Sequence, residues 1–100
     1  MQNEYFEWDD GKADANLRKH GVSFDEACTI FGDDYLLSFP DERKDYGEQR
    51  YFAYGTSAYG RMLTVIWTYR NNRYRLISAF VPEPNQRKIY EKRRYRHRNR

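Results

Sequence analysis

The second half of the chain contains three strand-length runs joined by short turns, and this arrangement limits the fold more than any other feature. The runs are Gln49–Thr56, Met62–Tyr69 and Tyr74–Phe80. A turn around residues 58–60 joins the first two, and a pair of asparagines at 71 and 72 gives a tight β-hairpin between the last two. The sequence therefore predicts a sheet of consecutive antiparallel strands.

The middle run is predicted to be the central strand. Its alternating side chains are apolar or neutral on both faces, so neither face is suited to solvent. The two sets are Leu63, Val65, Trp67 and Tyr69, and Met62, Thr64, Ile66 and Thr68. In the last run the side chains expected on one face, with two guanidinium groups together at the strand's start, are Arg73, Arg75, Ile77 and Ala79.

A helix is predicted near the N-terminus. Asp9 fits its N-cap, and it should run to His20 and stop at Gly21. Ala13 and Leu17 form a narrow apolar stripe along it. The adjacent polar stripe contains Lys12, Asn16 and Lys19.

A second helix follows directly. Ser23 and Glu26 make a capping box, and apolar residues continue at helical spacing until Gly32. Cys28 would then lie on the buried face as a small core residue rather than a reactive thiol.

The remaining elements complete a single α+β domain over residues 1–100. They are a strand at Glu4–Trp8, a strand at Tyr35–Phe39 that ends at Pro40, and a helix at Gln86–Tyr95. The expected order is β-α-α-β-β-β-α. Residues 93–100 are expected to form a basic, disordered tail.

The charges divide unevenly along the chain. Residues 1–48 carry five Lys/Arg and thirteen Asp/Glu, a balance of −8, whereas residues 49–100 carry thirteen basic and two acidic residues, a balance of +11. A clustered excess of arginine favours binding of a polyanion such as RNA. The alternative is a solvated basic segment that the acidic front neutralises.

Several classes of protein lack support in the sequence. The single cysteine excludes an intrachain disulfide, and the chain has no metal-ligand spacing, no Gly-rich phosphate loop and no nucleophile elbow. No cofactor is therefore expected. The apolar runs are too short for a membrane span, and the acidic N-terminus does not resemble a signal peptide, so a cytoplasmic location is expected. A DNA-binding module ranks last, because no helix-turn-helix or zinc-finger pattern is present.

RNA cleavage without a metal fits the residue types that remain. RNA carries its own nucleophile, the 2′-hydroxyl, and a protein must move protons and neutralise the charge that develops at phosphorus. Arginine suits the second task because its charged fork matches phosphate oxygens. The arginines on the predicted strands and the last helix are Arg50, Arg61, Arg70, Arg73, Arg75 and Arg87.

Five ordered stretches across residues 6–91 carry a family resemblance. They read FEWDDGKADANLRKHGVSFDEACTIF, LSFPD, GEQRYFAYGTSAYGRMLTVIWTYR, RYRLISA and RKIYE. The spacing WD-x₂-K-x₃-N-x₂-KHGVSF is the most specific part, and E-x-R-Y, GR-x-L-x-V and R-x-ISA add ordered matches. Together they resemble the BrnT family of toxins.

The resemblance implies a toxin of a type II toxin–antitoxin system with a RelE-like fold, a twisted antiparallel sheet with helices packed at one end. Such a toxin would be a metal-independent ribonuclease that blocks translation. Its partner would be a BrnA-like antitoxin with a ribbon-helix-helix domain, and the complex would bind operator DNA through that antitoxin.

The resemblance weakens after the last strand. Phe80 stands where the family usually has an arginine, Pro82 where it has a small residue, and Gln86 where it has a glutamate. These departures leave an alternative open, a catalytically weak or inactive protein that binds RNA or antitoxin and acts mainly in an autorepressor complex.

Four side chains are candidates for catalysis. Arg75 opens the R-x-ISA motif and suits phosphate contact, with a salt bridge to the acidic half as the alternative; folding is expected to need it little. Glu48 and Arg50 would point the same way from one strand, either as an acid–base and phosphate pair or as a surface ion pair worth under about 1 kcal/mol. His20 suits proton transfer because histidine changes charge near neutral pH, or it complements the helix dipole.

Candidates for RNA contact come from the first helix, the sheet and the last helix. They are Lys12, Asn16, Arg61, Arg70, Arg73, Arg87 and Tyr90. Lys12 and Asn16 match the family's helix motif, and packing or antitoxin contact is an equal alternative for both. Arg87 and Tyr90 lie one turn apart and are expected to face the sheet arginines. Trp8 is expected to be a core anchor.

Overall fold

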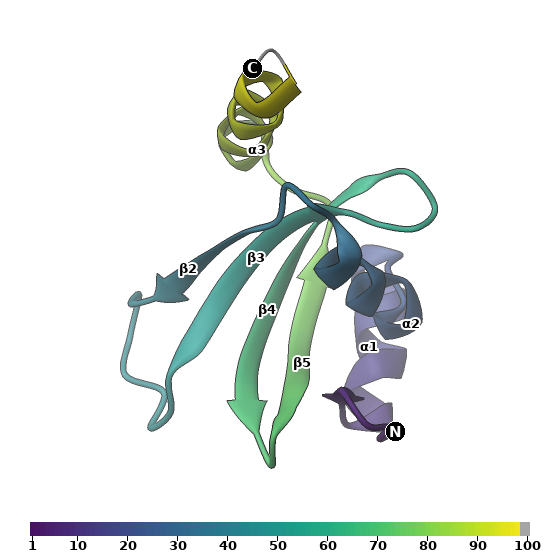
Figure 1. Ribbon diagram of the computed structural model, residues 1–100. Coiled ribbons are helices and arrows are strands. Elements are labelled where there is room, and N and C mark those ends of the chain that lie inside the picture. The colour runs from purple at the N-terminus through teal and green to yellow at the C-terminus, as the bar shows by residue number, and fades with distance from the viewer. Residues whose placement is uncertain (99–100) are drawn as a thin grey trace.

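The computed structural model describes residues 1–98 as a five-stranded sheet with helices on its two sides (Figure 1). In spatial order the strands are β1 (Phe6–Glu7), β5 (Arg73–Phe80), β4 (Met62–Arg70), β3 (Arg50–Thr56) and β2 (Leu37–Asp41). The α+β class and the central place of β4 are confirmed. The sheet is mixed rather than wholly antiparallel, because the short β1 pairs with β5 in parallel.

Four helical segments accompany the sheet. They are α1 (Asp10–His20), α2 (Phe24–Ala27), the 3₁₀ helix η1 (Cys28–Gly32) and α3 (Pro84–Arg98). In the described residues, 1–98, no helix is long and apolar enough to span a membrane. The predicted end of the last helix was wrong, since residues 93–98 continue it; residues 99 and 100 of the predicted tail lie outside the described part.

The predicted caps of the first two helices are confirmed. Asp9 accepts a hydrogen bond from the backbone N–H of Lys12 at 2.9 Å, and Gly21 ends α1 with a φ of 67°. Ser23 accepts from the N–H of Glu26 at 3.0 Å. The segment after Ser23 is not one helix, however, because it tightens into η1 at Cys28, whose partly buried side chain packs against the core.

Short-range sequence signals predicted the asparagine hairpin correctly, but they did not predict the bounds of the edge strand. Asn71 and Asn72 both have positive φ, 56° and 62°, as a tight hairpin requires. The strand predicted to end at Pro40 instead runs from Leu37 to Asp41. Proline is tolerated there because β2 is an edge strand, where a missing backbone donor need not break a ladder.

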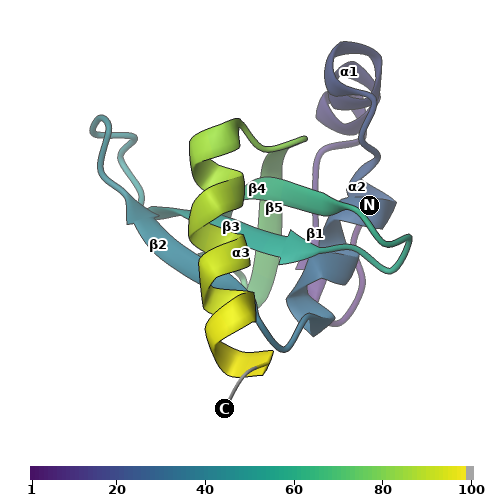
Figure 2. The ribbon, with the colours of Figure 1, turned by 90° about the horizontal axis from the view of Figure 1, so that it is seen from above.

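The two sides of the sheet differ. The helix face, the side carrying Ala53 and Val65, packs against α1 and α2 and forms the main core. Its buried residues are Trp8, Val22, Phe24, Ala27, Ile30, Ala53, Leu63, Val65, Leu76 and Ala79. The open face, the side carrying Phe52 and Ile66, is covered only at one end, where α3 passes above the strands (Figure 2). Tyr90 of α3 packs there with Tyr54 and Met62.

A β-bulge shifts the register between the two C-terminal strands. Ile66 pairs with Ser78, whereas the next residue, Trp67, pairs with Leu76, which leaves Ile77 as the extra residue of β5. A bulge of this kind reverses the alternation of side chains along the strand.

The bulge overturns the predicted face of β5. Leu76 and Ala79 are both fully buried on the helix face, three residues apart. Arg73 and Arg75 therefore project from the open face, opposite to Ala79, and the four residues predicted to share a face do not.

The predicted apolar stripe of α1 was wrong at Leu17, whereas Ala13 packs against the core. Leu17 is 51% exposed, whereas Asn16 is 7% exposed and lies against the sheet. The Asn16 amide donates to the carbonyl oxygens of Val22 at 2.9 Å and Ala79 at 2.8 Å, and its oxygen accepts from the N–H of Ala79 at 3.1 Å. Burial follows the hydrogen bonds rather than the apolar pattern, because the buried amide satisfies backbone groups of two other segments.

Candidate functional site

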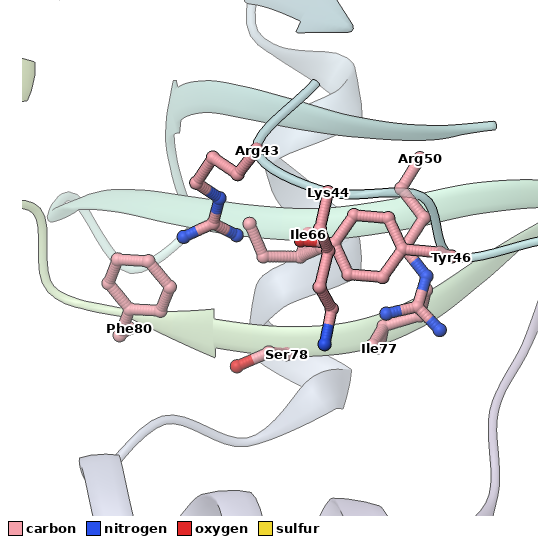
Figure 3. Close-up of a pocket in the computed structure, with 8 residues that line it drawn as sticks. All are labelled: Arg43, Lys44, Tyr46, Arg50, Ile66, Ile77, Ser78 and Phe80. Atoms are coloured by element: carbon pink, nitrogen blue, oxygen red, sulfur yellow. The ribbon is translucent and has the colours of Figure 1, made fainter. Parts of the chain in front are cut away.

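The open face carries a groove of ≈ 520 Å³ between the loop that follows β2 and the strands β3, β4 and β5 (Figure 3). Its lining residues are Arg43, Lys44, Tyr46, Arg50, Ile66, Ile77, Ser78 and Phe80. Three cations and one tyrosine thus stand over a mainly apolar floor. A phosphate and an unpaired base together need this combination of charge and apolar surface.

Asp41 holds the first cation of the groove in place. Arg43 donates two hydrogen bonds to its carboxylate, both at 2.9 Å, and the guanidinium also lies 4.6 Å from the centre of the Phe52 ring. The hydrogen bond from Arg43 lowers the pKa of the buried Asp41 to about 2. The loop is therefore anchored by a carboxylate that stays ionised at neutral pH.

Tyr46 connects the loop to the strand. Its hydroxyl donates to Asp41 at 3.1 Å, and its ring lies 5.1 Å from the ammonium of Lys44 and 4.3 Å from the guanidinium of Arg50. Figure 3 shows Tyr46 beside both cations, with the Lys44 ammonium extending towards Ser78. One aromatic ring thus positions cations from two different segments.

Glu48 pairs with two arginines. Its carboxylate accepts from Arg70 at 2.6 Å and from Arg50 at 3.0 Å. The hydrogen bond from Arg70 is the main cause that lowers the pKa of Glu48, and the bond from Arg50 adds to it. A carboxylate with a lowered pKa is a weak proton acceptor, so the arrangement favours an orienting role for Glu48 over a role as general base.

Arg75 lies on the open face beside the groove rather than among its lining residues. It is in register with Thr68, which is in register with Arg50. Its guanidinium donates to Glu7 at 3.3 Å, and Glu7 is only 6% exposed, with one oxygen, Oε1, buried and without a partner. The alternative given for Arg75, a salt bridge to the acidic half, is thus present, and removing Arg75 would leave a buried charge unpaired.

Two residues expected at an RNA surface have structural partners instead. Arg61 forms a two-pronged pair with Glu26, at 2.7 and 2.8 Å, and also donates to the carbonyl of Gly21. Tyr90 is 2% exposed, and its hydroxyl donates to Asp33 and lies 2.8 Å from the hydroxyl of Thr56. With the buried Asn16, these side chains hold elements together and do not face the groove.

The other candidates lie around the molecule. Arg73 donates to the carbonyl of Asn3 at 2.6 Å, Arg87 pairs with Glu91 at 3.4 Å, and Lys12 is exposed on α1. Neither Arg87 nor Tyr90 lines the groove, contrary to expectation.

His20 lies close to one end of the groove. Its ring centre is 5.6 Å from that of Phe80, which lines the groove. Gln86 lies nearby at the start of α3, where its side-chain oxygen accepts from the Thr64 hydroxyl at 3.0 Å and from the N–H of Glu83 at 3.1 Å. That oxygen therefore already accepts two hydrogen bonds, one from the sheet and one from the backbone at the start of α3.

The sequence reading missed the loop cations. Arg43, Lys44 and Tyr46 belong to the charged segment DERKDYGE, which reads as a connector. The signal that could have found them is an aromatic residue flanked by cations within a loop that ends at Arg50.

Comparison with known proteins identifies the family. The family described as "Ribonuclease toxin, BrnT, of type II toxin-antitoxin system" matches residues 8–81. The 1.1 Å crystal structure of the Brucella abortus ribonuclease toxin BrnT aligns with a TM-score of 0.63 and 20% identity, covering 81% of this chain and 99% of that chain. At that identity the alignment supports the fold alone. No curated protein sequence matches significantly. The family match spans most of the chain and confirms the resemblance seen in the motifs, so this chain belongs to the BrnT family of ribonuclease toxins of type II toxin–antitoxin systems.

Proposed function

We propose that the protein is an endoribonuclease whose substrate enters the groove of the open face. The observation that carries the proposal is the convergence of Arg43, Lys44 and Arg50 over an apolar floor. The family is one of ribonuclease toxins. Among the described residues, this groove brings cations and apolar side chains together. The backbone phosphate would lie against the cations, and a base would lie against Phe80 and the isoleucines.

The cations in and beside the groove have different roles in binding and stabilising phosphate in this proposal. Arg50 is fixed by Glu48 and Tyr46, so its fork is preorganised for the charge that develops at phosphorus. Lys44 reaches over the floor without a carboxylate partner among residues 1–98, and so it is available to a phosphate oxygen. Arg75 lies on the other side of Thr68 from Arg50 and would contact a neighbouring phosphate.

Proton transfer falls to His20 in this proposal. It packs on Phe80 at the groove's end, whereas Glu48 is bound by two arginines. The nucleophile would be the RNA 2′-hydroxyl, so the reaction would proceed without a metal ion.

The biological setting follows from the family. A type II system implies an antitoxin partner and an RNA substrate. We further propose that cleavage inhibits translation in the cytoplasm, and that the antitoxin is a BrnA-like ribbon-helix-helix protein that carries the complex to operator DNA.

A second candidate function has one observation in its favour. Phe80 brings no charge to the groove, and the oxygen of Gln86 is already bonded to Thr64 and Glu83. A protein that binds RNA or antitoxin with little cleavage would need no more than this.

The test compares Lys44→Gln with Lys19→Gln, which removes an equal charge from the exposed surface of α1. Cleavage of a long RNA in EDTA should fall about tenfold or more in Lys44→Gln, with an unchanged melting temperature, and stay at the parent level in Lys19→Gln. Equal cleavage by the two variants would contradict the groove as the active site. Retarded but intact RNA with the parent protein would establish the binding function instead.

A further inference from the structure

Helix α3 presents two different faces. The inner face holds Gln86, Tyr90 and Arg93, spaced one turn apart. Gln86 accepts from Thr64, Tyr90 is buried against β3 and β4, and Arg93 donates to the carbonyl of Tyr35 at 3.1 Å. These contacts fix how the helix is rotated on the sheet.

The outer face carries an unpaired cationic row, which we define as Lys88, Lys92 and Arg96. All three residues are exposed, and no carboxylate in residues 1–98 forms a salt bridge with any of them. The spacing of four residues brings their charges together on one side of the helix. Figure 2 shows α3 lying outermost above the sheet, and helical spacing puts the row on a different side of the helix from the inward-facing Gln86 and Tyr90.

The row destabilises the helix that carries it. Each pair of like charges at i and i+4 costs about 0.2–0.5 kcal/mol. Several other arginines differ, because Arg61, Arg70 and Arg75 each meet a carboxylate. The row therefore leaves positive charge that the fold does not neutralise, and an external anion would relieve its repulsion.

We propose that the row Lys88, Lys92 and Arg96 is a second RNA-binding surface that holds the phosphodiester backbone outside the groove. It rests on the proposed function in taking RNA as the ligand. The cations are about 6 Å apart along the helix axis, so an extended backbone can meet one cation per turn. The helix begins at Pro84, after the residues 8–81 that the family model matches.

Charge complementarity favours RNA over a protein partner on this face. A protein interface is usually built around an apolar, charge-depleted centre, whereas this row is cationic along its length. Polyanion binding needs no such centre and gains from counterion release.

The experiment pairs Lys88→Gln/Lys92→Gln with Arg18→Gln/Lys19→Gln, which removes two exposed charges from α1. The probe is a fluorescent single-stranded 2′-O-methyl RNA, which cannot be cleaved through its 2′-oxygen, titrated from 50 to 200 mM salt. In the α3 variant affinity should fall at least about fivefold at the lowest salt, and the slope of log affinity against log salt should flatten by about 1.4. The α1 variant should keep the parent slope, and the melting temperature of the α3 variant should equal or exceed the parent's.

Three outcomes would overturn the proposal. One is a salt slope in the α3 variant equal to the parent's. Another is an equal loss of affinity in the two variants, which would indicate net charge alone. The third is unchanged RNA binding with weakened binding of the antitoxin, which would assign the row to that protein. Because the probe is not cleaved, these results stand whether or not the groove is catalytic.

Discussion

The two faces of one sheet do different work with side chains that alternate along the same strands. On β4, Leu63 and Val65 are fully buried under α1 and α2, while Ile66 points into the groove beneath Lys44 and Tyr46. The helix face is stabilised by apolar contact. The open face instead holds charges in place through carboxylates, as Asp41 holds Arg43 and Glu48 holds Arg50.

That difference changes how the uneven charge of the sequence is understood. Acidic residues of the first half pair with basic residues of the second, as in Glu26–Arg61, Glu7–Arg75 and Glu48–Arg70. Part of the positive excess is therefore neutralised within the fold. Cations without a salt bridge among residues 1–98 include Lys44 in the loop after β2 and Lys88, Lys92 and Arg96 on the outside of α3.

The largest expected effect is a difference in the free energy of unfolding between two variants of β4, one on each face of the sheet. Leu63→Ala should lower the free energy of unfolding by about 4 kcal/mol, because it leaves a cavity in a dry core. Ile66→Ala should cost about 2 kcal/mol, the low end of the same range, because water in the groove can fill the space. Urea denaturation of both variants measures the difference, and equal losses would mean that the open face is packed as tightly as the core.

The next prediction sharpens the role of the paired arginines. Arg75→Ala should destabilise the protein by about 3 kcal/mol, since it leaves the carboxylate of Glu7 buried and unpaired. Adding Glu7→Gln should recover part of that loss by removing the buried charge. A single variant as stable as the parent would show that the pair is not needed for folding.

A smaller effect on stability is expected when the pH is lowered, because carboxylates paired with arginine become protonated. The pKa values of Glu26 and Glu48 are lowered from their ordinary 4.5 by hydrogen bonds from Arg61 and Arg70, and that of Asp41 falls from 3.8 to about 2 through Arg43. With lowered values the folded state binds fewer protons than the unfolded state. These pairs therefore stabilise the fold fully above pH 4.5, and their contribution is lost as the pH falls towards 2.

Denaturant midpoints between pH 7 and pH 2 measure this loss. Glu48→Gln should show a shallower decline than the parent, because one of the titrating pairs is absent. A midpoint that rises on acidification would contradict the assignment of these pairs.

The sequence predicted those parts of the fold that depend on neighbours in the chain. The caps at Asp9 and Gly21, the asparagine hairpin and the central β4 all depend on short-range signals. It failed where a distant partner decides. Asn16 is buried because its amide bonds to Ala79, 63 residues away, and the partner of Arg75 is Glu7, 68 residues away.

The site was harder to predict than the fold for the same reason. A residue's charge is visible in a sequence, but its carboxylate partner is not. Arg61 and Arg75 read as free cations and are paired, whereas Lys44 reads as part of a connector and reaches into the groove. The bulge at Ile77 also reverses the alternation of side chains along β5, and no local sequence pattern predicts this bulge.

The central claim is that RNA binds the open face and not the helix face. The most direct measurement follows methyl NMR signals while the 2′-O-methyl RNA is titrated into the protein. Ile66 and Ile77, which line the groove, should shift with occupancy, while Val65 and Leu76, buried on the other side of the same strands, should not. Shifts confined to Val65 and Leu76, or spread equally over both pairs, would contradict the account.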